Sequence, residues 1–139
     1  MVAIKIGMTG TREGASQEAL NSFYRYLMTI VVEEAHHGDC VGADQQFHQL
    51  VTQRGIKTIV HPPIKGVYRA HCQGTEIREC KDYLDRNRDI VDECDILVAF
   101  PKSKVEEARS GTWYTVRYSY KQDKPVMLFY PDGSMSGSG

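Results

Sequence analysis

Four short motifs rich in glycine, hydroxyl and arginine side chains occur in order along the chain, each where an extended apolar run gives way to a helical pattern. They are residues 7–12 (GMTGTR), 38–44 (GDCVGAD), 86–88 (RNR) and 110–113 (SGTW). In an open parallel α/β sheet, loops leaving the carboxyl ends of strands meet at one edge, where backbone N–H groups and helix N-termini can hold an anion. The pattern therefore predicts a site for a nucleotide-type ligand.

Glycine and hydroxyl side chains carry most of this prediction. Glycine has no Cβ and lets backbone N–H groups approach a phosphate closely, while Ser and Thr hydroxyls either add donors or cap the following helix. The residues of this kind that we expect at the ligand, together with Ala43 of the second motif and Pro101 just after the apolar run 95–100, are Gly7, Thr9, Gly10, Thr11, Gly42, Ala43, Pro101, Ser110, Gly111 and Thr112.

An arginine has a planar group with several donors that can contact a phosphate. Alternatively, it can lie on the protein surface, where it is solvated or paired with a carboxylate. We predict ligand contacts from Arg12 and Arg86, whereas Arg88 lies two residues further on and so on a different helix face. Asn87 could read a base edge or cap a helix. Trp113 could stack on a base or belong to the core or a subunit interface.

Two aspartates are the acidic candidates, Asp39 and Asp44. A carboxylate at this edge could accept from ribose hydroxyls, orient water or hold a hydrated divalent cation beside a phosphate. As catalytic residues they would supply acid–base function for N-glycosidic hydrolysis, while helix capping is the alternative for Asp44.

Histidines at positions 36, 37, 48 and 61 raise the question of a metal. Their spacing matches no recognised ligand pattern, and hydrogen bonding in the core or a pocket explains them more simply. The sequence therefore predicts no metal site, and no cofactor beyond a divalent cation that could accompany a phosphate.

The hydrophobic pattern alternates between strands and helices. Strands are predicted at residues 2–6, near 37–40, and at 56–61, 95–100 and 126–130; helices at 16–31, 44–54, 81–94 and 111–121, with Ser16 as the first cap. Residues 64–80 lack periodicity and are interpreted as a long loop at the site. We expect an α/β, Rossmann-like, mostly parallel sheet of about five strands with helices on both faces and right-handed crossovers.

Composition limits the alternatives. The 139 residues suit one domain, at 1–131, followed by a Gly/Ser-rich flexible tail at 132–139. A net charge of −1 provides no general basic field for nucleic acid. No signal peptide is evident, and no apolar run approaches the ~18 residues of a membrane span. Four cysteines without C-x-x-C spacing indicate reduced thiols in a cytoplasmic protein.

Together, the four motifs and the segments 36–44, 61–63, 83–91 and 110–115 resemble the SLOG superfamily. This Rossmann-like group includes the cytokinin-activating phosphoribohydrolases and the DNA-uptake protein DprA, and the most similar branch is the small YspA/YpsA-like, DUF2493-type domain. The resemblance covers residues 2–131. It implies a nucleotide or nucleotide-derived ligand at the carboxyl edge of the sheet.

The resemblance does not carry an activity with it. The phosphoribohydrolases have a Pro-Gly-Gly-x-Gly-Thr-x-x-Glu motif with a catalytic glutamate, and Thr115 occupies that position here. A hydroxyl cannot replace a carboxylate as a general base near neutral pH. The sequence therefore favours a sensor or sequestering module that binds its ligand.

Two alternatives stay open at this point. One is hydrolysis of nucleoside monophosphates or related nucleotides, and the other, ranked last because of the charge balance, is DprA-like binding of single-stranded DNA. Aromatic residues on the predicted helices exceed what one small sheet must cover, which predicts a homo-oligomer. These residues are Tyr24, Tyr26, Trp113, Tyr114, Tyr118 and Tyr120.

Overall fold

A seven-stranded sheet runs through the protein, whose computed structural model describes residues 2–138. The strand order is β4-β3-β2-β1-β5-β6-β7, and all pairs are parallel except β6 with β7. The strands are β1 (Ala3–Gly10), β2 (Val31–His37), β3 (Lys57–Val60), β4 (Glu76–Ile77), β5 (Ile96–Phe100), β6 (Val126–Phe129) and β7 (Met135–Ser138). This confirms the predicted α/β, Rossmann-like class.

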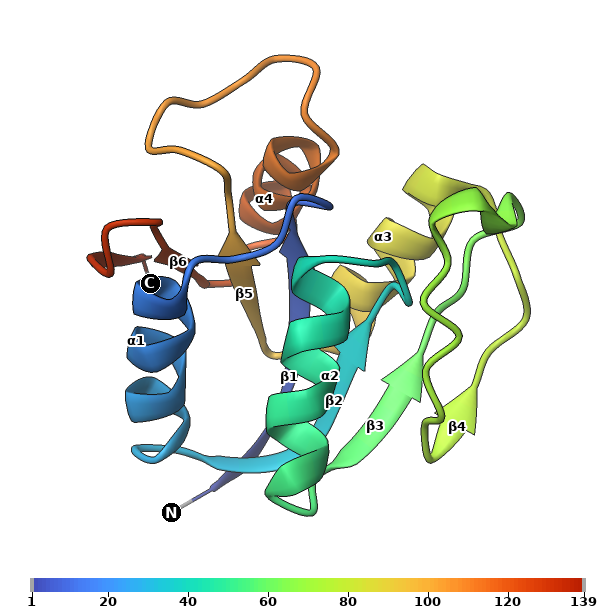
Figure 1. The fold of residues 1–139 in the computed structure, drawn as a ribbon, viewed down its shortest axis with the longest axis horizontal. Helices are drawn as coiled ribbons and strands as arrows, with labels where there is room; N and C mark the ends of the chain where they lie inside the picture. The colour runs from blue at the N-terminus through green and yellow to red at the C-terminus, as the bar shows by residue number, and fades with distance from the viewer. Residues whose placement is uncertain (1, 139) are drawn as a thin grey trace.

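Four helices cover the two faces of the sheet (Figure 1). They are α1 (Gln17–Leu27), α2 (Ala43–Gln53), α3 (Tyr83–Glu93) and α4 (Gly111–Lys121). On one face, α1 and α2 enclose a core in which Phe23 contacts the rings of Phe47, Phe100 and Phe129. On the other face, residues of α3 and α4 pack with β5 and β6. The sheet is therefore buried on both sides, as parallel sheets require.

The central strand β1 packs differently on its two faces. Ile6 and Met8 are buried in the core beneath α1 and α2. Gly7 faces α3, where a Cβ would lie 2.7 Å from Cγ2 of Ile90. The glycine therefore lets α3 approach the sheet closely, and it lies inside a strand rather than in a ligand-facing turn.

Several helix boundaries follow the predicted capping chemistry. The Ser16 hydroxyl accepts from the Ala19 N–H at 3.1 Å, and α2 is followed by Gly55 at φ 72°, a conformation that favours glycine. Two boundaries were predicted wrongly. Helix α1 ends at Leu27, and the N-cap of α2 is Gly42 rather than Asp44.

The strands also differ from the prediction in position and number. The second strand is Val31–His37, because the β-branched pair at positions 31 and 32 joins the ladder with β1 instead of extending α1. The predicted loop at 64–80 contains a short 3₁₀ helix, η1 (Gly66–Tyr68), and β4. Within the expected tail, Met135–Ser138 pairs with β6 as β7. These two short strands bring the sheet from about five strands to seven.

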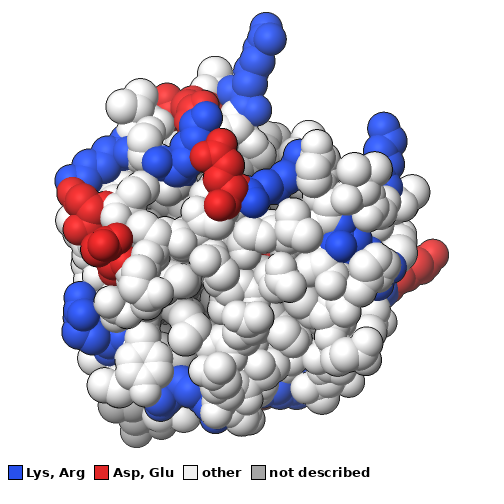
Figure 2. All heavy atoms as spheres, in the orientation of Figure 1, with Lys and Arg blue, Asp and Glu red and all other residues white. Residues whose placement is uncertain are grey.

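The face of the molecule drawn in Figure 2 has no extended patch of a single charge. In Figure 2, basic and acidic side chains are intermixed around the rim of the visible face, with a largely uncharged area between them. Of the aromatic residues expected at a subunit contact, Tyr24 and Tyr120 are exposed while Trp113 is buried. Within residues 2–138, no helix is long and apolar enough to cross a bilayer.

Candidate functional site

The loop after β1 is held in place at the carboxyl edge of the sheet. The Thr11 N–H donates to the Phe100 carbonyl at 3.1 Å, and the Ala43 N–H donates to the Thr11 carbonyl at 3.0 Å. Gly42, at φ 89°, packs against the backbone of Arg12. The ends of β1 and β5 and the start of α2 thus fix the position from which Arg12 projects.

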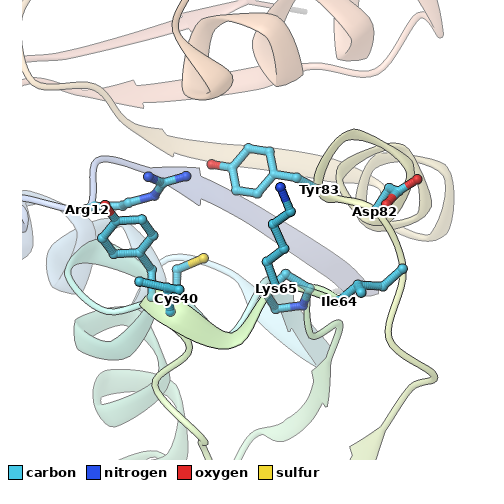
Figure 3. Close-up of a pocket in the computed structure, with 9 residues that line it drawn as sticks. Arg12, Cys40, Ile64, Lys65, Asp82 and Tyr83 are labelled. Carbon is cyan, nitrogen blue, oxygen red and sulfur yellow. The ribbon is translucent and has the colours of Figure 1, made fainter.

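Two adjoining cavities open at this edge and share Arg12 and Tyr83. The first, of about 490 Å³, is enclosed mainly by apolar and aromatic groups (Figure 3). Its lining residues are Arg12, Cys40, Pro63, Ile64, Lys65, Val67, Tyr68, Asp82 and Tyr83. In Figure 3 the ends of Arg12, Lys65, Tyr83 and Cys40 lie around a common space, while Asp82 lies to one side. The volume is in the range of small-molecule sites.

The second cavity, of about 540 Å³, lies at the N-terminus of α4 and is more polar. Its lining residues are Gly10, Thr11, Arg12, Glu13, Tyr83, Leu84, Lys102, Glu107, Arg109, Ser110, Gly111 and Thr112. The Ser110 hydroxyl caps α4 by accepting from the Trp113 N–H at 3.2 Å. A helix N-terminus beside basic side chains is suited to holding an anion.

Arg12 connects the two cavities. Its guanidinium carbon lies 4.2 Å from the centre of the Tyr68 ring and 5.3 Å from that of Tyr83. Among residues 2–138, neither Arg12 nor Lys65 nor Arg109 forms a salt bridge with a carboxylate. These cations therefore retain charge that could be directed at an anionic ligand.

Arg86, which the sequence placed at the ligand, lies inside the protein and is 2% exposed. Its Nη1 donates to the carbonyls of Gly38 and His61, the latter at 2.9 Å, and its Nη2 donates to the Cys40 sulfur at 3.3 Å. The guanidinium thus ties the loop after β2 to the end of β3. Both terminal nitrogens take part in these contacts, and the residue lines neither cavity.

Asp44 lies beneath the same loop. One carboxylate oxygen accepts from the N–H groups of Gly38 at 3.1 Å and Cys40 at 3.3 Å. Burial raises the pKa of Asp44 to about 6, although the Arg86 charge and the backbone donors act in the opposite direction. The side chain orders the loop and lines neither cavity.

Asp39 also forms hydrogen bonds inside the protein. Its carboxylate accepts from Arg69 Nε at 2.6 Å and from the Cys72 N–H at 2.8 Å, and its backbone adopts φ 59°. These contacts hold residues 69–72 against the loop after β2. Asp39 is fully buried and also lies outside both cavity linings.

The remaining predicted residues divide into two groups. Gly10, Thr11, Arg12, Ser110, Gly111 and Thr112 line the polar cavity. Thr9, Asn87 and Trp113 are buried. Pro101 lines a separate cavity of about 200 Å³. Gly42 and Ala43 contact the backbone of residues 11 and 12. The first and last motifs therefore meet as expected, whereas the second and third mainly hold the loops that surround them.

Thr115 has no access to this edge of the sheet. It is 1% exposed, and its hydroxyl donates to the Gly111 carbonyl within α4 at 2.9 Å. The hydroxyl of this side chain is therefore held by a hydrogen bond within its own helix.

Five aromatic or basic residues of the cavity linings were not predicted as ligand contacts: Lys65, Tyr68, Tyr83, Lys102 and Arg109. Lys65 and Tyr68 belong to the segment predicted as a loop at the site, and Tyr83 is the first residue of α3, three positions before Arg86 of the third motif. Lys65 and Tyr68, a basic and an aromatic residue close together in a segment without periodicity, were the signal in the sequence that could have indicated these contacts.

Comparison with solved structures gives the same architecture. The structure of the molybdenum cofactor binding protein from the phototrophic bacterium Rippkaea orientalis matches with a TM-score of 0.67 and 22% identity, over 92% of this chain and 77% of the other. TM1055 matches with a TM-score of 0.63 and 14% identity, over 88% and 71%.

DprA from Streptococcus pneumoniae matches with a TM-score of 0.62 and 19% identity, over 91% of this chain and 50% of DprA. No protein-family model matches the sequence, and no curated protein is significantly similar to it. All three matches are below 25% identity. The chain shares the Rossmann-like α/β fold of these structures.

Proposed function

We propose that the protein binds a nucleotide or nucleotide-derived ligand across the two cavities, as a sensor or sequestering module. The observation that carries the proposal is the junction of an aromatic-lined cavity and a basic, helix-capped one at the shared residues Arg12 and Tyr83. A nucleotide has the matching division into a flat, stackable base and an anionic phosphate.

The phosphate is assigned to the cavity at the N-terminus of α4. Backbone N–H groups at that terminus carry a partial positive charge, and Arg109 and Arg12 line the same space. The only acidic residues in this lining are Glu13 and Glu107, and Glu107 lies 3.7 Å from Lys102. This leaves the two arginines to balance the charge of a phosphate.

The base is assigned to the cavity beside Tyr68. The Tyr68 and Tyr83 rings offer stacking surfaces, and the apolar side chains of Ile64 and Val67 complete the wall. Binding without turnover is favoured because the side chains considered for catalysis, Asp39, Asp44 and Thr115, form hydrogen bonds inside the protein.

Isothermal titration calorimetry with four nucleoside monophosphates, the matched nucleosides and inorganic phosphate tests the proposal. We expect at least one monophosphate to bind about 10-fold or more tightly than its nucleoside, since a charge-assisted contact contributes about 1.5–3 kcal/mol. Arg109→Ala should remove most of that difference, and Tyr68→Ala should weaken the binding of both ligands. Arg54→Ala, at the residue that follows α2 and outside both cavity linings, should change neither affinity.

Two outcomes would contradict the proposal: no monophosphate binds, or nucleoside and monophosphate bind equally. Chromatography of the bound nucleotide after incubation tests the binding-only version. Intact nucleotide is expected, whereas release of the base would favour N-glycosidic hydrolysis.

A further inference from the structure

Two groups of three ligating side chains lie on opposite faces of β2, apart from the cavities described above. His36, His61 and Glu93 form one group on the α3 face. His37, His48 and Cys72 form the other on the α2 face. In each group, one donor atom of every residue lies within 4.8 Å of the other two. Distance alone does not distinguish them, but their hydrogen bonds do.

In the first group, a carboxylate fixes the protonation of the central ring. His36 Nε2 lies 2.8 Å from Glu34 Oε1, and because an ionised carboxylate only accepts, the ring carries its proton on Nε2. The lone pair on His36 Nδ1 therefore faces His61 Nε2, 2.8 Å away. A carboxylate behind an imidazole is the arrangement that orients and strengthens metal-binding histidines.

In the second group, the hydrogen bonds oppose metal binding. His37 Nδ1 accepts from the Asp39 N–H at 3.0 Å, so the neutral ring carries its proton on Nε2, directed at His48 Nδ1 at 2.9 Å. If a metal were bound to His37 Nε2, the neutral ring would carry its proton on Nδ1 and could no longer accept from the Asp39 N–H. Keeping that contact would require a ring that has lost both protons. Burial also raises the pKa of the Cys72 thiol to about 12, which disfavours the thiolate.

We propose that His36 Nδ1, His61 Nε2 and a carboxylate oxygen of Glu93 bind a divalent transition-metal ion, with Zn²⁺ as the best-suited probe. Two imidazoles and one carboxylate form a recognised zinc ligand set with an open fourth position. Tetrahedral coordination at a Zn–N distance of about 2.0 Å needs the two ring nitrogens about 3.3 Å apart, so the pair must open by roughly half an ångström. His61 then carries its proton on Nδ1.

The charges around this group are compatible with a bound cation. Glu93 is the last residue of α3, where the helix dipole favours positive charge. Arg78 Nη2 contacts one Glu93 oxygen at 2.7 Å, which leaves the other for the ion. Lys5 and Lys57 lie 3.9 and 3.7 Å from Glu34, and both are exposed enough for solvent to screen them.

The three ligands come from β2, from the end of β3 and from α3, positions 36, 61 and 93 in the sequence. This separation explains why spacing along the chain predicted no metal site. A bound ion would join the sheet to the helix that begins with Tyr83, and would stabilise the folded protein according to its concentration and Kd.

Zinc titration of the chelator-treated full chain, followed by calorimetry and by melting temperature, tests the proposal. We expect one Zn²⁺ per chain, with binding weakened about 10-fold or more in Glu93→Gln and also in Glu34→Gln, which removes the carboxylate behind His36. Cys72→Ser and His48→Gln, in the other group, should bind as the unaltered protein does. Circular dichroism verifies the fold of each variant, and Glu93 is exposed enough for its amide to be accommodated.

Cobalt substitution adds a spectroscopic readout. A site of two imidazoles and a carboxylate gives Co²⁺ ligand-field bands without a sulfur-to-metal charge-transfer band. The proposal is overturned if Zn²⁺ does not bind stoichiometrically, if Glu93→Gln binds it unchanged, or if a sulfur charge-transfer band appears and is lost in Cys72→Ser.

Discussion

The guanidinium of Arg12 lies 4.2 Å from the centre of the Tyr68 ring, at the boundary between the aromatic and the basic cavity. The two residues come from segments 56 positions apart in the sequence. A cation above an aromatic face is attracted by the ring, so each side chain restrains the other. This contact places one positive charge where both a base and a phosphate could reach it.

The position of Arg12 depends on Gly42, and this can be tested with alanine. A Cβ at Gly42 would lie 2.6 Å from the Arg12 carbonyl carbon, and φ is 89°. Gly42→Ala should therefore lower the free energy of unfolding by more than 2 kcal/mol, roughly twice the backbone penalty of left-handed alanine alone. Urea unfolding measures the loss.

Gly55→Ala is the matched control. Gly55 also has positive φ, 72°, but a Cβ added at this position would meet no other atom within 4 Å. The substitution should cost about 1 kcal/mol and leave nucleotide affinity unchanged. Equal losses in the two variants would show that the Gly42 contact with the Arg12 backbone has no energetic role.

Arg86 is predicted to stabilise the fold rather than bind the ligand. Arg86→Lys keeps the charge but cannot reproduce the contacts to two carbonyls and the Cys40 sulfur, so the free energy of unfolding should fall by about 2–4 kcal/mol. Arg88→Lys, on the exposed side of α3, should change it by less than about 1 kcal/mol. An Arg86→Lys protein of normal stability that has lost nucleotide affinity would instead support a ligand contact.

Asp44 should make stability depend on pH. Burial raises its pKa from 3.8 to about 6 in the folded protein, so its contribution is favourable at low pH and is lost as the pH rises from about 4 through 6. Asp44→Asn removes this dependence while retaining an oxygen that can accept from Gly38 and Cys40. The stability of Asp44→Asn relative to the unaltered protein should rise by roughly 2 kcal/mol between pH 4.5 and 7.5.

Urea unfolding at several pH values gives this difference. Asp85→Asn, at an exposed carboxylate of α3, is the comparison and should run parallel to the unaltered protein. A parallel profile for Asp44→Asn would mean that its carboxyl titrates alike in the folded and unfolded chain.

Much of the fold was predictable from local pattern. The helix at Gly111–Lys121 was predicted at its observed ends, because Ser110 supplies a cap and the apolar period continues to the turn at 122. The boundary between α1 and β2 was not, because Ile30 and Val31 suit either a helical face or a strand. Strand β4 has two residues, too few to form a pattern, and exists through its pairing with β3.

The candidate site was predictable only in part, because long-range contacts decide which motif residues line the cavities. Arg86 looks like a phosphate ligand in sequence, yet its partners Gly38 and His61 lie 48 and 25 positions away. The Asp39 carboxylate is likewise held away from the cavities by its hydrogen bond with Arg69. Gly10, Arg12 and Ser110 were predicted to lie together, and they line one cavity, because loops at the carboxyl ends of neighbouring parallel strands must converge.

The most direct test of the central claim, that Arg12 joins two halves of one nucleotide site, is native mass spectrometry. The protein is incubated with an equimolar mixture of nucleoside mono-, di- and triphosphates, and Arg12→Ala and the distant Arg54→Ala are treated identically. If Arg12 joins the two halves of the site, we expect a one-to-one nucleotide adduct that falls about 10-fold or more in Arg12→Ala and persists in Arg54→Ala. An unaltered protein without any nucleotide adduct, or an adduct undiminished in Arg12→Ala, would contradict it.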